Sequence, residues 1–338
     1  MRGFMKPGSV SRSVLLLVVA LGWPLAVWGQ KGGSLGLSQT ISLPGVQGGF
    51  NHMSVDAEHQ RLFAAAPTNK TLEIVDLKSG SPWRSLEGER PAAARYAPEF
   101  NQLYVSSGQN ICIYDGRSFA PIVRINLRSR LDQLEYSAHA KELYVGCMTT
   151  SQTGIAVIAI PEGRLLGKIV FPASPQGIAA EEGGGRIFAN IPETSSIEVV
   201  DRKERKIVAT WQLPGLRDNF PMALDETDHR LFVACRRPAE MLALDTESGK
   251  IVARVRCVSD ADDMSYDPAH KRLYITGGEG SISVIEQRDA DRYRLLGRVT
   301  TVPGAATSTF SGQLNFLYVG VPERDNEAAQ IRVFKVGK

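Results

Sequence analysis

The chain has 338 residues, of which 43% are hydrophobic and 22% are charged, and it contains four cysteines. This balance is typical of a folded globular protein and excludes a disordered, fibrous or disulfide-stapled chain. The formal net charge of +3 comes from 39 Lys and Arg against 36 Asp and Glu. Three of the basic residues, Arg2, Lys6 and Arg12, lie in the first 29 residues, which contain no acid. Without that segment the chain is formally neutral, which gives no support to nucleic-acid binding.

The first 29 residues have the features of a secretory signal peptide. The three basic residues precede an apolar run from Val14 to Leu21, and small or uncharged residues stand ahead of Gln30. We therefore predict removal of residues 1–29 and a periplasmic or secreted location for the mature protein. An uncleaved N-terminal anchor is the alternative, although the apolar run is short for a spanning helix. No membrane span is expected after cleavage.

The cysteines occur singly and lack the paired spacings of zinc or haem sites. Cys112 lies within the run ICIY, and Cys147 and Cys235 each follow a Leu-aromatic-Val triplet, so small buried side chains are expected. A disulfide between two of them stays open in an oxidising compartment. No cofactor is predicted from these residues: Cys112, Cys147, Cys235 and Cys257.

One sequence pattern recurs along the whole chain after residue 30. It consists of a short strand, a polar turn, and then Leu or Ile followed by Phe or Tyr. The ten residues before each of these pairs align without a gap, as in HMSVDAEHQR and DMSYDPAHKR. The seven pairs are Leu62-Phe63, Leu103-Tyr104, Leu143-Tyr144, Ile187-Phe188, Leu231-Phe232, Leu273-Tyr274 and Leu317-Tyr318.

Within each repeat the apolar residues alternate with a period of two, and Gly, Pro, Asp and Ser separate the runs. This pattern predicts four short antiparallel strands in each repeat. Aspartates such as Asp76 and Asp245 close the third strand and favour a tight hairpin. Seven such units of about 42 residues predict an all-β, seven-bladed β-propeller that occupies residues 30–338 as one domain.

The ends of the chain predict how the ring closes. The seventh repeat ends too soon after Phe334 to contain its fourth strand. The segment Gln39–Gly45, QTISLPG, matches the fourth strands that end in WQLPG and TTVPG elsewhere. We therefore expect the N-terminal strand to complete the last blade.

The sequences LYV at 103, 143 and 317, LYI at 273 and LFV at 231 resemble the YVTN-type bacterial β-propellers, with YVSS, YVGC, YITG and YVGV in place of the full tetrad. The resemblance covers all seven repeats. It implies a periplasmic or secreted propeller that is structurally similar to the haem-binding propeller of cytochrome cd1 nitrite reductase. These motifs mark strand packing, so the resemblance implies no particular activity.

The predicted functional face is the one with loops of variable length after each second strand, because irregular loops on a rigid scaffold carry most binding sites. The innermost residues of that face stand ten or eleven positions before each pair. Their polar members and those of neighbouring loops form the candidate ligand-binding set. It consists of His52, Gln176, Asn219, Arg236, Arg237, Asp262, Asp263 and Glu279.

Three interpretations of this set stay open. The first is a non-catalytic propeller that binds a small polar ligand or a periplasmic protein partner, with Arg236 pairing with an anionic group. The second is a cation-dependent hydrolase, because gluconolactonase-like propellers are similar in architecture and hold a divalent cation with acidic and amide side chains. Asp263, Asn219 and Glu279 are the candidate ligands for that cation. The third is that these charges pair with one another between blades.

Overall fold

The computed structural model describes residues 1, 3, 34–149 and 153–337. The predicted signal peptide lies almost entirely outside the described residues, so its cleavage stays a prediction. Among the residues that are described, no helix is long and apolar enough to cross a membrane. The four cysteines lie in the described part and are free thiols, with Cys147, Cys235 and Cys257 buried.

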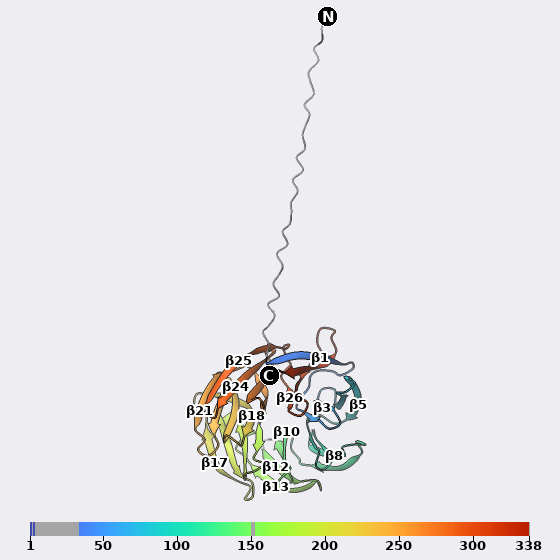
Figure 1. Ribbon diagram of the computed structural model, residues 1–338. Coiled ribbons are helices and arrows are strands. Elements are labelled where there is room, and N and C mark those ends of the chain that lie inside the picture. The colour runs from blue at the N-terminus through green and yellow to red at the C-terminus, as the bar shows by residue number, and fades with distance from the viewer. Residues whose placement is uncertain (2, 4–33, 150–152, 338) are drawn as a thin grey trace. The chain divides into compact units, whose positions relative to one another are not determined.

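The described chain from residue 34 onward folds into seven four-stranded antiparallel sheets arranged around a central channel (Figure 1). This confirms the predicted all-β, seven-bladed propeller. The first strands of consecutive blades contact one another around the ring, and the first strand of blade 7 contacts that of blade 1. The channel is therefore enclosed by seven first strands.

The strands follow one another along the chain in blade order. Blade 1 contains β2 (Met53–Asp56), β3 (Arg61–Ala66), β4 (Thr71–Asp76) and β5 (Ser81–Glu87). Blade 2 contains β6 (Pro91–Ala97), β7 (Gln102–Ser107), β8 (Asn110–Asp115) and β9 (Pro121–Asn126). Blade 3 contains β10 (Leu131–Ser137), β11 (Glu142–Cys147), β12 (Gly154–Ala159) and β13 (Arg164–Val170).

Blade 4 contains β14 (Ile178–Ala180), β15 (Arg186–Ile191), the short 3-10 helix η1 (Pro192–Thr194), β16 (Ser196–Asp201) and β17 (Lys206–Gln212). Blade 5 contains β18 (Arg217–Asp225), β19 (Arg230–Arg237), β20 (Ala239–Asp245) and β21 (Ile251–Arg256). Blade 6 contains β22 (Ala261–Asp267), β23 (Arg272–Gly277), β24 (Ser281–Asp289) and β25 (Arg292–Thr300). Blade 7 contains β26 (Ser308–Ser311), β27 (Phe316–Val321), β28 (Ala329–Val336) and β1 (Leu35–Leu43).

The last blade is completed from the N-terminal end, as the sequence predicts. The order of its strands is β1-β28-β27-β26, with β1 antiparallel to β28 from Leu35 opposite Val336 to Leu43 opposite Ala329. Ile41 and Leu43 are each 1% exposed and pack into the core of this blade. Backbone pairing and side-chain burial thus close the ring.

Arginines at the start of second strands tie neighbouring blades together. The Arg61 guanidinium of blade 1 donates to the Gly116 carbonyl of blade 2 at 2.7 Å, and it also pairs with the buried Asp56. In blade 5, Arg230 donates to the Ala290 carbonyl of blade 6 at 2.9 Å. Each bond satisfies a carbonyl in the adjoining blade and fixes the spacing between blades.

The hairpin aspartates also lie as predicted. The Asp76 carboxylate accepts hydrogen bonds from the backbone N–H groups of Lys78 and Ser79 at 2.8 and 3.1 Å. Asp245 accepts in the same way from the backbone N–H of Ser248 at 2.9 Å. These bonds begin the turn between the third and fourth strands.

Deletion of residues 30–45 from the mature protein tests the ring closure. We expect a lower melting temperature and concentration-dependent association, because the deletion exposes the edge of β28 and removes two core side chains that contribute about 2 kcal/mol each. Leu37→Ser is the matched control, because Leu37 lies on the same strand and is 56% exposed. Calorimetry and light scattering provide the measurements, and a truncated chain that melts with the wild type and stays monomeric would contradict the closure.

Candidate functional site

The first strands enclose a cavity of about 270 Å³ in the channel. One wall is polar and includes His52, Arg95, Gln133 and Glu135. Blades 6 and 7 add Asp263, Ser265, Ser308 and Thr309. Blades 4 and 5 contribute residues of apolar type, of which Ile178 and Met222 are buried in hydrophobic cores. The surface that lines the cavity is therefore mainly polar.

A smaller cavity of about 60 Å³ lies at the variable-loop end of the channel. It shares His52 and Gln133 with the larger cavity, so the two adjoin. We call this smaller cavity the mouth. Its lining residues are Asn51, His52, Asp132, Gln133, Gln176, Phe220, Pro221 and Asp262.

Irregular pairing at the start of the first strands builds the mouth. In blade 3, Leu131 pairs with Cys147 and Leu134 pairs with Val145, which leaves Asp132 and Gln133 opposite one residue. Blade 5 shows the same irregularity after Asn219, and blade 6 shows it after Ala261. A regular strand sends consecutive side chains to opposite faces, whereas a bulge redirects them. The bulges therefore allow neighbouring residues such as Asp132 and Gln133 to line one cavity.

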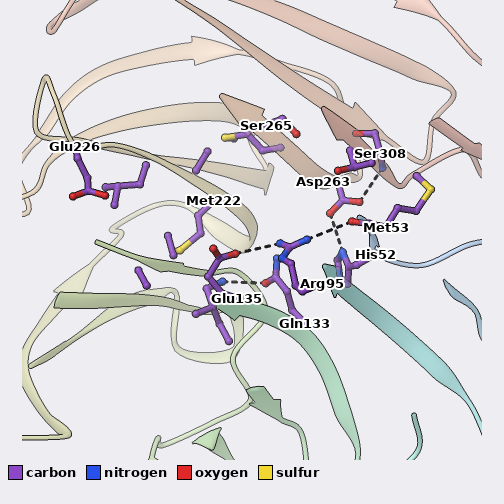
Figure 2. Close-up of a pocket in the computed structure, with 17 residues that line it drawn as sticks. His52, Met53, Arg95, Gln133, Glu135, Met222, Glu226, Asp263, Ser265 and Ser308 are labelled. Atoms are coloured by element: carbon purple, nitrogen blue, oxygen red, sulfur yellow. Dashed lines mark hydrogen bonds and ion pairs between the residues drawn. The ribbon is translucent and has the colours of Figure 1, made fainter. Parts of the chain in front are cut away.

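An ion pair between His52 and Asp263 joins blades 1 and 6 beside the mouth. The Nδ1 atom of His52 lies 2.9 Å from one carboxylate oxygen of Asp263. The other Asp263 oxygen accepts from the backbone N–H of Ser308 in blade 7 at 2.9 Å. Figure 2 shows these contacts at one end of the cavity. Both Asp263 oxygens are thus engaged, and the plane of the imidazole is fixed.

The charges around His52 keep its ring protonated. Burial by itself lowers the pKa of His52, but Asp263, with smaller contributions from Asp132 and Asp262, raises that pKa from 6.5 to about 9. Burial, together with the charge of Asp263, raises the pKa of Asp262 to about 6. The raised pKa of His52 reflects the negative charge around it, whereas that of Asp262 reflects burial first and the neighbouring carboxylate second.

Arg236 holds the bulge of blade 6 in place. Its guanidinium donates to the Ala261 carbonyl at 2.9 Å and to Asp262 at 2.7 Å, and it pairs with Asp260 at 2.9 Å. It also lies over the Phe220 ring, 3.8 Å from the ring centre. The structure thus commits Arg236 to protein partners, so it positions Asp262 and Phe220 at the mouth.

Asn219 takes part in a buried network between blades 4 and 5. It is 0% exposed, and its Nδ2 donates to Asn190 Oδ1 at 3.0 Å and to the Ser196 carbonyl at 2.9 Å. Asn190 in turn donates to the Phe220 carbonyl at 3.0 Å. Asn219 lines neither cavity, and its contacts stabilise the bulge of blade 5.

Glu279 and Arg237 likewise lie outside both cavity linings. Glu279 accepts from the Ser259 backbone N–H at 3.2 Å and from Ser281 Oγ at 2.7 Å. Arg237 is exposed and pairs with Asp218. Of the predicted set, the structure brings together His52, Gln176, Asp262 and Asp263, with Arg236 behind them.

The three candidate ligands for a cation are held in separate networks. Asp263 bonds to His52 and Ser308, while Asn219 and Glu279 have the partners given above. Within the described ranges, no group of three or more His, Cys, Asp or Glu side chains has a geometry that could hold a metal ion. The arrangement therefore gives the lactonase interpretation no ligand set among these residues.

Sequence reasoning left several lining residues out of its candidate set. Asp132, Gln133 and Phe220 occupy the same repeat positions as the chosen Asp262 and Asp263, so the alignment itself could have selected them.

Arg95 and Glu135 lie two residues further along their strands and form a 3.2 Å ion pair across blades 2 and 3. Residues two apart on a strand point to the same face, so Arg95 could have been placed in the channel from Ala93, and Glu135 from Gln133.

Comparison with known proteins supports a bacterial seven-bladed propeller at low sequence identity. The chain is 27% identical to the uncharacterized protein YncE of Salmonella typhi over 161 residues, which cover 46% of this chain and 44% of YncE. It is 22% identical to antigen Lp49 of Leptospira interrogans over 238 residues, which cover 68% of this chain and 49% of Lp49. The chain thus spans about half the length of the curated relatives it matches. No protein-family model matches it.

Solved structures share the fold at still lower identity. A chain in a crystal structure of a mitotic checkpoint complex superimposes with a TM-score of 0.77 and 14% identity, covering 97% of this chain and 100% of that one. A chain of the Kuenenia stuttgartiensis hydrazine synthase gives a TM-score of 0.74 and 17% identity, covering 84% of this chain and 95% of that one. These likenesses establish the propeller fold alone.

The raised pKa of His52 predicts a pH-dependent contribution to stability. A histidine with a raised folded-state pKa stabilises the fold fully below its unfolded pKa of 6.5, and this stabilisation is lost as the pH rises through about 9. Relative to His52→Asn, the wild-type advantage in the free energy of unfolding should therefore shrink by on the order of 3 kcal/mol between pH 6.5 and 9.5.

Urea unfolding at the two pH values measures this difference. His139→Asn is the control, because His139 lies in an exposed turn on the opposite face. If the difference in free energy of unfolding between the wild type and His52→Asn is the same at both pH values, Asp263 does not keep the His52 ring protonated.

Proposed function

We propose that the protein is an exported, non-catalytic β-propeller that binds a small polar ligand with a positively charged group at the mouth of its channel. The observation that carries this proposal is the convergence of His52, Asp132, Gln176 and Asp262 on one small cavity. Bulges in the first strands place Asp132 and Asp262 there, and His52 and Gln176 come from the segments that precede the first strands of blades 1 and 4.

Local charge supports a cationic group on the ligand. Four carboxylates lie at the mouth or beside it: Asp132, Asp260, Asp262 and Asp263. Two cations, His52 and Arg236, are bonded to carboxylates of this group. Four carboxylates against two cations leave a formal charge of −2. The sole side-chain donor to Asp132 among the described residues is Asn51 Nδ2, at 3.3 Å, so this carboxylate keeps free acceptor positions.

The enclosed shape favours a small molecule over a protein partner. The lining residues come from the inner ends of first strands and from the segments that precede them, which lie at the channel axis. A protein partner would instead use the exposed loops around the channel. Because ordered side chains already fix the geometry of the mouth, a ligand would bind with little reorganisation.

Export is part of the proposal and rests on the N-terminal segment. The basic start, the apolar run from Val14 to Leu21 and the resemblance to YVTN-type propellers all point to a periplasmic or secreted protein.

Isothermal titration calorimetry with 3-methylbutylamine tests the mouth as a cation site. We expect saturable binding at pH 7.5 and at least a tenfold loss of affinity in Asp132→Asn, because this substitution removes the least neutralised carboxylate. Acetate should give no heat of binding under the same conditions.

Glu99→Gln is the matched control, because Glu99 lies in an exposed turn between β6 and β7 at the other end of the blade. This variant should bind the amine like the wild type. Equal affinities of the wild type and Asp132→Asn, or no binding by the wild type, would overturn the proposed site.

A further inference from the structure

The larger cavity below the mouth carries more hydrogen-bond donors than the protein itself uses. Gln133 Oε1 accepts from the Ile178 backbone N–H at 3.0 Å, which fixes its amide and leaves the NH₂ group without an acceptor among the described residues. His52 uses Nδ1 for Asp263, and no described residue accepts a hydrogen bond from its Nε2. Both side chains line the mouth and the larger cavity.

Arg95 adds further donors deeper in the channel. Its guanidinium donates to Glu135 at 3.2 Å and to the Met53 carbonyl at 3.3 Å, and these bonds use two of its five N–H groups. Figure 2 shows the guanidinium between these two partners.

Two of the carboxylates facing this cavity have donors at both oxygens. Asp263 accepts from His52 and Ser308, whereas Glu135, deeper in the channel, accepts from Arg95 at one oxygen. Glu226 accepts from the backbone N–H groups of residues 182 and 183 at 2.7 and 2.9 Å. The unused hydrogen-bonding capacity at the upper end of the cavity is therefore mainly that of donors, and a ligand would satisfy it with oxygen acceptors.

The two kinds of group come from neighbouring residues. Asp132, which attracts a cation, and Gln133, which offers an NH₂ group, are consecutive residues of one bulge, and both line the mouth. A ligand that carries an ammonium and a carboxylate group close together would offer a partner to each. An α-amino acid carries them on a single carbon.

The larger cavity has space for the rest of the ligand. Ala179 and Ala223 stand two residues beyond Gly177 and Pro221, in the positions that Arg95 and Glu135 occupy in their strands, and line the cavity from blades 4 and 5. Ile178 and Met222 are buried in the hydrophobic cores beside it. The volume of about 270 Å³ equals that of about nine water molecules. This space is sufficient for a side chain of amino-acid size.

From this arrangement we infer that the ligand is a free α-amino acid. Its ammonium group binds Asp132 and Asp262, its carboxylate accepts from His52 Nε2 and the Gln133 NH₂ group, and its side chain extends into the larger cavity beside Ala179 and Ala223. The inference rests on the proposed function, because it assigns a ligand class to the same mouth.

Three matched probes separate the contributions of the two ligand groups. L-Leucine has both charged groups, 3-methylbutylamine lacks the carboxylate, and 4-methylpentanoate lacks the ammonium group. Calorimetry at pH 7.5 should show leucine binding at least tenfold more tightly than the amine and more tightly still than the acid.

Two variants locate the carboxylate site. Gln133→Glu keeps an oxygen for the Ile178 N–H but replaces the NH₂ group by an acceptor, and His52→Gln removes the charged donor. Each should weaken leucine binding at least tenfold without weakening amine binding. Glu99→Gln should leave both affinities unchanged. Circular dichroism and thermal melts verify that the variants are folded.

The outcomes distinguish the two claims. If the amine binds in an Asp132-dependent manner but leucine binds no more tightly, the amino-acid inference is wrong and the proposed mouth site stands. If neither binds, both are wrong. Leucine binding that is unaffected by both carboxylate-site variants would also overturn the inference.

Discussion

Backbone pairing between β1 and β28 is the constraint on which the rest of the structure depends. Without it, blade 7 has three strands and an exposed edge at β28, and the backbone pairing that joins the two ends of the chain is lost. Closure matters for the channel because His52 meets Asp263 across 211 positions of sequence and from blades that are not neighbours. The inter-blade bonds of Arg61 and Arg230 then keep the first strands at a fixed distance from the channel axis.

Bulges in the first strands direct additional side chains into the channel and so form the candidate site. A propeller of perfectly regular first strands would present one side chain per blade at each level of the channel. Here the irregular pairing in blades 3, 5 and 6 allows Asp132 and Gln133, and likewise Phe220 and Pro221, to line the mouth in pairs. At the level of Arg95 and Glu135, blades 4 and 5 supply the small residues Ala179 and Ala223, which leaves space for the cavity.

The fold could be predicted almost completely from the sequence, because seven repeats share a segment that aligns without a gap, and the N-terminal strand matches the strand that the last repeat lacks. The site could be predicted in part. Repeat alignment places His52 and Asp263 at the channel, but it does not reveal bulges, so it missed the paired direction of Asp132 and Gln133. Repeat alignment also does not show whether a side chain points into the channel or toward the neighbouring blade. Asn219 points into the interface with blade 4, where it bonds to Asn190. Glu279 was expected at the site because of its carboxylate, but that carboxylate accepts hydrogen bonds from Ser259 and Ser281 of the same blade.

The histidine ring signals in nitrogen-15 NMR spectra test the central claim most directly, because His52 is the one histidine that lines the mouth among five in the chain. At pH 7.5 the account predicts a His52 ring protonated on both nitrogens, with an Nε2 signal that moves on addition of L-leucine. The signals of His59, His139, His229 and His270 should stay in place. A neutral His52 ring, or one whose signals are unchanged by leucine at saturating concentration, would contradict the account.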